Sequence, residues 1–150
     1  MSTEENKAII HKFIDAYNKR DLKVFDELVA PDYFDQTFQQ KRREPFKQLF
    51  TMAFQTFPDW HEAIEDIIAE GDKVWVRVKA TGTNTGEWNL FGVKIPPTGK
   101  KVTMRMIFNW RIVNGKLVEG GEVDDNLPFL KDLGFIEYTK KGKPLEAVFK

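Results

Sequence analysis

The stretch from residue 102 to residue 125 is the sequence feature that most restricts how this chain can fold. Apolar residues occupy every second position of its first half, which are Val102, Met104, Met106, Phe108, Trp110 and Ile112. Such alternation is typical of a β-strand with one buried face. The pair Asn114-Gly115 follows and is a strong two-residue hairpin signal, so residues 116–125 are expected to return as the antiparallel partner.

A helical pattern precedes these strands. Ser2 and Glu5 have the spacing of a capping box, and apolar residues follow at helical intervals, so a first helix is expected over residues 3–19. A short second helix is expected to begin after Asp21 and to end at Pro31.

A third helix is expected to begin at Glu44-Pro45, because proline is tolerated in the first turn. The other expected elements are an exposed loop over 37–43, strands over 61–69 and 73–83, a long connection over 84–101 with a short strand around Trp88, and a helix from about Asn126. Helices followed by a run of antiparallel strands predict a single α+β domain that spans residues 1–150.

Charge and composition exclude several classes of function. The 23 Lys and Arg residues balance the 23 Asp and Glu residues, so no broad positive field for nucleic acid or a membrane surface is expected. The chain has no cysteine and only 2 histidines, which argues against disulfides, thiolate chemistry and a metal site. No apolar run approaches the roughly 20 residues of a membrane span, and the N-terminus lacks the apolar core of a signal peptide. A cytoplasmic protein is therefore expected.

The register of the expected hairpin brings a carboxyl group to an apolar face. If pairs are counted outward from the turn, Asp125 lies opposite Met104, on the face that carries the methionine and aromatic side chains. A carboxyl group in such surroundings has a raised pKa and can act as a general acid or base. A one-residue slip would exchange Asp125 with Asp124, and Gly120-Gly121 is a place where a bulge could form. The alternative without chemistry is that Asp125 caps the helix that follows.

Six short segments occur in a characteristic order before Asp125. They are APDYFDQ at 30–36, FPDW at 57–60, AEGDKV at 69–74, TGTNTGE at 81–87, PTGK at 97–100 and NGKLVE at 114–119. In this order and spacing the chain resembles the SnoaL-like polyketide cyclase (ester cyclase) family of the nuclear transport factor 2-like superfamily. The resemblance implies a cone-shaped α+β barrel, in which a curved, mainly antiparallel sheet wraps around helices and encloses a pocket. It also implies homodimers that pack through the sheet.

The resemblance also implies an activity. Family enzymes use an acidic residue in the pocket to transfer a proton during an intramolecular aldol ring closure, without metal or cofactor, and the position that matches this acid is Asp125. Gln36 and Asn84 stand where the family commonly has histidine, and Gly121 stands where a tryptophan often precedes the acid. Glutamine and asparagine can hydrogen-bond but cannot exchange protons near neutral pH.

The leading hypothesis is therefore a lyase or isomerase that needs no cofactor. It would perform aldol-type cyclisation, isomerisation or dehydration on a small hydrophobic carbonyl compound. Asp125 would move the proton, Gln36 and Asn84 would hold the oxygen, and the apolar wall would comprise Tyr33, Phe54, Met104, Met106, Phe108 and Trp110. Two alternatives stay open, which are a non-catalytic protein that binds a small hydrophobic ligand and an interaction module that uses an exposed sheet face.

Overall fold

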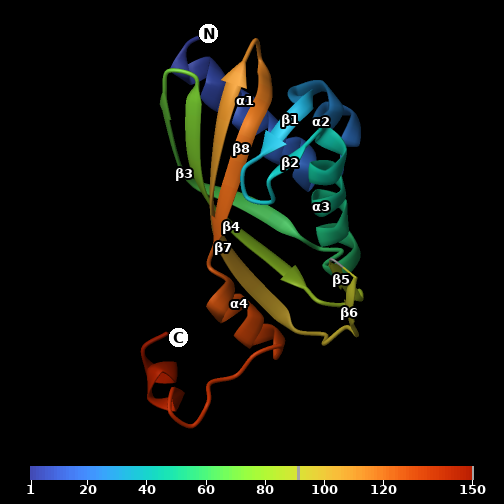
Figure 1. Ribbon diagram of the computed structural model, residues 1–150, viewed down its shortest axis with the longest axis vertical. Coiled ribbons are helices and arrows are strands. Elements are labelled where there is room, and N and C mark those ends of the chain that lie inside the picture. The colour runs from blue at the N-terminus through green and yellow to red at the C-terminus, as the bar shows by residue number, and fades with distance from the viewer. Residues whose placement is uncertain (91, 150) are drawn as a thin grey trace.

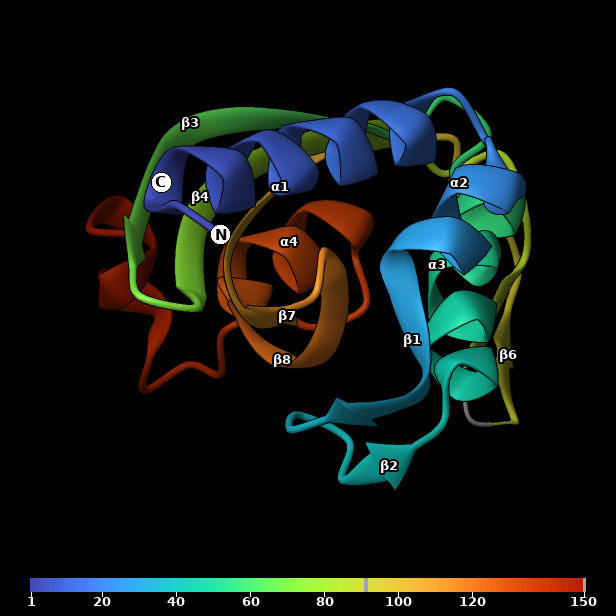
Figure 2. The same ribbon diagram turned by 90° about the horizontal axis from the view of Figure 1, so that it is seen from above.

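The structure is a computed structural model that describes residues 1–90 and 92–149. Its first helix, α1 (Thr3–Asn18), begins at the predicted capping box. The Ser2 hydroxyl accepts a hydrogen bond from the Glu5 backbone N–H at 3.1 Å, and the Glu5 carboxylate accepts one from the Ser2 backbone N–H at 2.6 Å. The predicted first helix is confirmed, and Figure 2 shows that it lies along the sheet.

The second helix ends earlier than predicted. Helix α2 (Leu22–Leu28) stops before Pro31, and β1 (Val29–Asp35) follows directly. The pairing of β1 with β8 shifts between Val29 and Phe34, so Pro31 lies where the ladder is interrupted and its missing N–H costs little. The expected loop over 37–43 also contains a two-residue strand, β2 (Gln40–Lys41). The sequence analysis missed both strands.

Six strands form the main sheet, in the order β2-β1-β8-β7-β4-β3. All neighbours are antiparallel except β1 and β8. The long strands are β3 (His61–Glu70), β4 (Lys73–Thr83), β7 (Lys101–Val113) and β8 (Lys116–Asp124), and these four predictions are confirmed. The short strand expected around Trp88 is also present, as β5 (Trp88–Leu90), which pairs with β6 (Val93–Ile95). The sheet curves around α1, α2 and α3 (Arg43–Thr56), as Figures 1 and 2 show.

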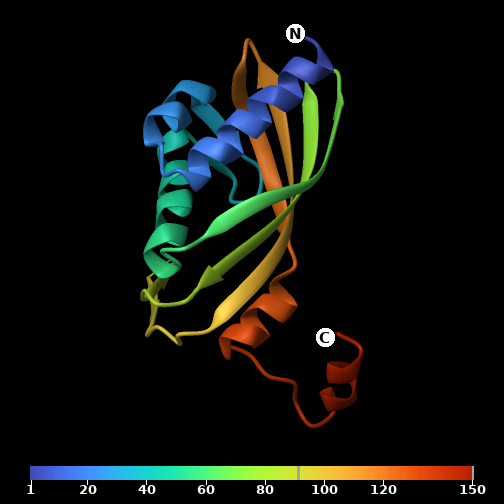
Figure 3. The same cartoon turned by 180° about the vertical axis from the view of Figure 1, so that it is seen from behind.

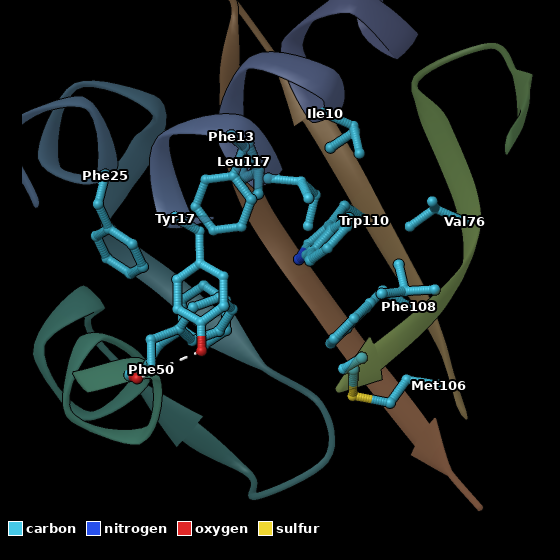
Figure 4. Close-up of a cluster of buried hydrophobic side chains, with 14 of the residues drawn as sticks. Ile10, Phe13, Tyr17, Phe25, Phe50, Val76, Met106, Phe108, Trp110 and Leu117 are labelled. Carbon is cyan, nitrogen blue, oxygen red and sulfur yellow. Dashed lines mark hydrogen bonds between the residues drawn. The ribbon is translucent and has the colours of Figure 1, made fainter. Parts of the chain in front are cut away.

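The core lies between the concave face of the sheet and these helices. Phe13 of α1 is at its centre, with ring centroids 5.5 Å from Phe25, 5.7 Å from Phe50 and 5.6 Å from Trp110. Trp110 stacks on Phe108 at 4.9 Å (Figure 4). Aromatic rings bury much area per residue, so this cluster forms a large part of the core and holds α1 and α3 against the sheet.

The hairpin turn is as predicted, but the register beyond it is not. Asn114 and Gly115 have φ of 49° and 76°, the positive values that a type I′ turn requires. Ile112 pairs with Leu117, whereas Arg111 pairs with Glu119, so β8 contains one extra residue at this point. This bulge lies on the turn side of the two glycines and shifts every later pair by one.

The bulge places a glycine against a large ring. A Cβ atom at Gly120 would lie 2.3 Å from Cδ1 of Trp110 and 2.6 Å from the Tyr33 hydroxyl, so a side chain at this position would clash. Without the bulge, Glu119 would face Trp110 in the core, and burying that charge would be costly. With it, Glu119 points outward and pairs with Arg111 at 3.1 Å. The packing of Trp110 therefore favours the bulged register.

Helix α4 (Asn126–Leu133) begins where it was expected and lies at the far end of β7 and β8 (Figure 1). It buries Phe129 and Leu133, each 1% exposed. The chain then runs away from the sheet to the short helix η1 (Lys143–Ala147), as Figure 3 shows. In the described part of the chain, no helix is both long and apolar enough to cross a membrane.

Candidate active site

A cavity of about 190 Å³ lies at the α4 end of the cone. Residues from α1, α3, β3, β5, β7, β8 and α4 enclose it. The apolar part of its wall comprises Tyr17, Phe38, Leu49, Phe50, Met52, Ala53, Phe57, Trp60, Trp88, Met104, Met106, Phe108 and Phe129. Such a concave, mostly apolar space with a few polar groups is typical of a small-molecule site.

Three carboxyl groups interrupt this apolar wall among the described residues, namely Glu62 of β3 and Glu122 and Asp124 of β8. Two other strands, β7 and β4, separate β8 from β3 in the sheet. The curvature of the sheet brings both strands to the same cavity. The polar side of the pocket is therefore a product of the tertiary fold.

Glu62 is the most deeply buried of the three, with 4% of its surface exposed. Its backbone is fixed by Asn18, whose amide donates to the Glu62 carbonyl at 2.8 Å and accepts from its N–H at 2.8 Å. The Trp60 indole donates to Oε1 of Glu62 at 3.3 Å, whereas Oε2 has no hydrogen-bond partner within the described ranges. Burial raises the pKa of Glu62 from 4.5 to about 7.

Glu122 and Asp124 both project from the pocket face of β8. Burial raises the pKa of each carboxyl, and for Glu122 the nearby charges of Asp124, Glu62 and Asp35 raise it further. Oδ1 of Asp124 is buried and without a hydrogen-bond partner among the residues described. The Glu122 backbone is fixed, because its N–H donates to the Thr37 hydroxyl at 2.7 Å.

These surroundings suit proton transfer. Three acids that disfavour ionisation in one another's presence do not all lose their protons at neutral pH. The pocket therefore holds protonated and ionised carboxyl groups together, which is what general acid and general base catalysis of one reaction needs.

The predicted position of Asp125 is wrong. The bulge in β8 places Asp124 opposite Met106, so Asp125 lies outside the cavity and is exposed. Asp125 occupies the N-cap position of α4, but its side chain makes no capping hydrogen bond within the described chain. Its backbone N–H instead donates to the Arg105 carbonyl at 2.9 Å and continues the β7–β8 ladder.

The apolar residues expected around the substrate divide into two groups. Met104, Met106 and Phe108 line the cavity. Tyr33 and Trp110 are buried in the aromatic core instead, where Tyr33 stacks on Phe46 at 4.6 Å. Phe54 packs against Tyr17 at 4.6 Å and lies outside the cavity as the described residues outline it.

The two residues expected to hold a substrate oxygen are engaged elsewhere. Gln36 is exposed on the outer side of the sheet, where it donates to Glu119 and accepts from Asn109. Asn84 is 0% exposed, and its side chain donates to the Gly86 carbonyl and accepts from the Thr98 N–H and hydroxyl, each at 2.9 Å. Asn84 thus ties down the connection that precedes β7, and its predicted position in the pocket is wrong.

Sequence reasoning missed Glu62 and Glu122. The sequence does contain a signal for Glu122. An unbulged hairpin would pair the charged Glu119 with the buried Trp110, and this unfavourable pair indicates that the register shifts by one, which turns Glu122 inward. Glu62 carries a weaker signal, since it shares the inward face of β3 with Ile64. The described residues contain no group of three or more His, Cys, Asp or Glu side chains placed to hold a metal ion.

Comparison with known proteins identifies the family to which this chain belongs. The sequence model of the SnoaL-like polyketide cyclase family matches residues 7–133. The chain belongs to this family. Its curved sheet around N-terminal helices is the nuclear transport factor 2-like α+β fold that the sequence predicted. Among the curated proteins, none matches the chain.

Several solved structures are similar over almost the whole chain. AclR from Streptomyces galilaeus, described as a candidate hydroxylase, has a TM-score of 0.79 at 29% identity, and the match covers 91% of this chain and 100% of that one. IdmH from Streptomyces antibioticus, described as a candidate polyketide cyclase, has a TM-score of 0.72 at 29% identity over 86% and 98% of the two chains. A SnoaL-like polyketide cyclase from Agrobacterium tumefaciens shares the fold at 15% identity, with a TM-score of 0.74 over 89% of this chain and 100% of the other.

Proposed function

We propose that this member of the SnoaL-like family is an acid/base enzyme that moves a proton at a carbon next to a carbonyl group of a small hydrophobic compound. Asp124 takes the role that the sequence analysis gave to Asp125. Aldol-type cyclisation, isomerisation and dehydration all begin with such a proton transfer, and none of them requires a cofactor when the acid and base are positioned.

One observation supports this proposal above the others, which is the carboxyl group of Asp124 in the wall of an apolar cavity. Its buried Oδ1 has no partner within the described residues, so the hydrogen-bonding capacity of this oxygen is unused. The pKa of Asp124 is raised by burial, which brings its proton affinity closer to that of a carbon acid than an ordinary aspartate has. Glu122, whose pKa is also raised, stays protonated more readily and can donate to the developing enolate oxygen.

The test uses β-tetralone, an apolar ketone with acidic hydrogens next to its carbonyl. Exchange of these hydrogens in heavy water is followed by proton NMR with wild type, Asp124→Asn and Asp125→Asn. Wild type is expected to accelerate the exchange, and Asp124→Asn to lower the protein-catalysed rate by about 100-fold or more. Asp125→Asn is the matched control, since it makes the same change one residue away on an exposed side chain.

Two results would contradict the proposal. If Asp124→Asn catalyses exchange as fast as wild type, Asp124 is not the base. If no variant accelerates exchange but β-tetralone still perturbs the indole NMR signals of Trp60 and Trp88, which line the cavity, the protein is a non-catalytic binder of small hydrophobic ligands.

The remaining expectations concern the whole molecule. We propose one domain over residues 1–150 that acts in the cytoplasm as a homodimer. The outer face of the sheet carries apolar side chains that are open to solvent, with 64% of Ile68, 49% of Trp75, 44% of Ile107 and 75% of Val123 exposed. A second copy on this face would cover them. Sedimentation of wild type against Trp75→Lys tests this, because a dimer through the sheet is expected to dissociate in the variant.

A further inference from the structure

The carboxyl groups of the cavity have no cationic counterpart in its wall. Glu62, Glu122 and Asp124 line it, and no lysine or arginine does so within residues 1–90 and 92–149. Arg20 is close enough to lower the pKa of Glu62 slightly, but its guanidinium is already engaged. It packs 3.8 Å over the Phe54 ring and donates to the carbonyls of Asn18 and Pro58. Among the described residues, Arg20 therefore offsets only part of the negative charge that develops in the cavity, and no cation in the wall pairs with it.

The geometry of Glu62 indicates what could balance it. The side chain is 4% exposed, and its backbone is fixed to α1 through Asn18. Glu62 lines the cavity, where its Oε1 accepts from Trp60 and its buried Oε2 has no hydrogen-bond partner in the described chain. A buried carboxylate oxygen without a donor costs free energy, and a donor that also carries positive charge compensates both the hydrogen bond and the charge.

The rest of the cavity suits the same kind of ligand. Tyr17, Trp60 and Trp88 contribute aromatic rings to the wall. Electron-rich rings attract organic cations as well as apolar groups. A neutral hydrocarbon would use the rings but leave Oε2 of Glu62 unpaired.

We infer that the compound bound in this cavity is a hydrophobic amine, whose protonated nitrogen donates to Oε2 of Glu62 while its apolar part lies among the aromatic rings. The inference rests on the proposed function and narrows its substrate class to carbonyl compounds that also carry a basic nitrogen. Glu62 holds the ammonium group, and Asp124 is left to move the proton. An alkyl amine is protonated well above neutral pH, so the charge is present under ordinary conditions.

The binding should depend on pH in a defined direction. The groups that face these carboxyls are Tyr17 and Arg20 from the α1 side, Tyr33 and Asp35 from β1, and the three acids themselves. Glu62 changes charge between about pH 5 and pH 8.5, because its pKa is about 7, and burial raises the pKa values of Glu122 and Asp124 toward the same range. Affinity for an amine should therefore rise as the pH rises through this range, and affinity for a neutral analogue should not.

The test compares phenethylamine with phenethyl alcohol, which share the ring and the linker and differ only in the terminal group. Dissociation constants are measured by calorimetry at about pH 5 and about pH 8.5. At the higher pH, wild type is expected to bind the amine at least about tenfold more tightly than the alcohol. Glu62→Gln is expected to lose this preference while keeping its affinity for the alcohol. Glu70→Gln, the same change at the exposed end of the same strand, should behave as wild type.

The possible failures separate this inference from the proposed function. If the alcohol binds as tightly as the amine in wild type, or if Glu62→Gln keeps the preference, the amine inference is wrong, and the exchange of β-tetralone hydrogens still tests the proposed function by itself. If neither compound binds and β-tetralone exchange is also absent, both proposals are wrong. If β-tetralone exchange is catalysed but neither compound binds, only the amine inference is overturned.

Discussion

The two ends of the β7–β8 hairpin use the same pleated geometry for opposite purposes. Near the turn, Trp110 lies against Gly120, and the ring fills the space that a side chain on β8 would occupy. At the other end, Met106 lies opposite Asp124 and both line the cavity. Ring against glycine makes a filled core, whereas thioether against carboxylate leaves a hollow with a polar wall.

The same contrast separates two glutamates only three residues apart on β8. Glu119 points outward and pairs with Arg111, and the hydrogen bonds from Gln36 and Arg111 hold its pKa below the ordinary value. Glu122 points inward, and burial raises its pKa. Solvent and partners thus decide whether a carboxyl on this strand is an ordinary surface charge or a reactive group.

The largest expected effect on stability comes from adding a side chain at Gly120, near the turn of the hairpin. Gly120→Ala would place a Cβ 2.3 Å from the Trp110 ring, so we expect the free energy of unfolding to fall by about 3 kcal/mol or more. At Gly121 the nearest atoms, Cβ of Gln36 and Oγ1 of Thr37, would be 3.2 Å away, so a shift of a few tenths of an ångström would accommodate the new methyl group. Gly121→Ala should therefore stay within about 1 kcal/mol of wild type in urea denaturation. The reverse order would mean that the bulge is absent.

A smaller effect, which depends on pH, is expected for Glu62, the buried acid that β3 contributes to the cavity. The folded state holds the Glu62 proton up to about pH 7, whereas the unfolded chain loses it near pH 4.5. Between these values the unfolded state binds fewer protons, so stability falls as the pH rises, by at most about 3 kcal/mol for this group. Glu62→Gln should remove this part of the decline, and Glu70→Gln should leave it. A Glu62→Gln profile that falls as steeply as that of wild type would contradict the buried position of Glu62.

The smallest effect on stability is expected for Glu119, which lies on the outer face of the sheet. Glu119→Gln should lower stability at neutral pH by less than about 1 kcal/mol, because the pair with Arg111 is partly exposed, and added salt should reduce the difference.

Glu122→Gln should shift stability in the opposite direction, since it removes a carboxyl whose ionisation is disfavoured in the fold. Chemical denaturation of both variants at low and high salt provides the measurement. A loss of stability in Glu122→Gln equal to that in Glu119→Gln would show that the two acids have similar surroundings.

Much of the architecture could be predicted from local patterns. The capping box at Ser2, the Asn114-Gly115 turn and the alternation along β4 and β7 each depend on residues close together in the chain. The position of Asp125 could not be predicted in this way, because one extra residue in β8 inverts every side chain beyond it. Counting pairs from the turn assumes an unbroken ladder, and the cost of burying Glu119 against Trp110 is what breaks it.

The sequence by itself determined the main helices, the long strands, the order of these elements along the chain and the family. These follow from periodicity, turn chemistry and short motifs that act over a few residues. Only the tertiary structure decided which acids meet in the cavity. Glu62 and Asp124 are far apart in sequence and lie on strands that are not neighbours, and the curvature of the sheet brings them to one pocket. That curvature and the bulge depend on how the aromatic core packs as a whole, which no local pattern records.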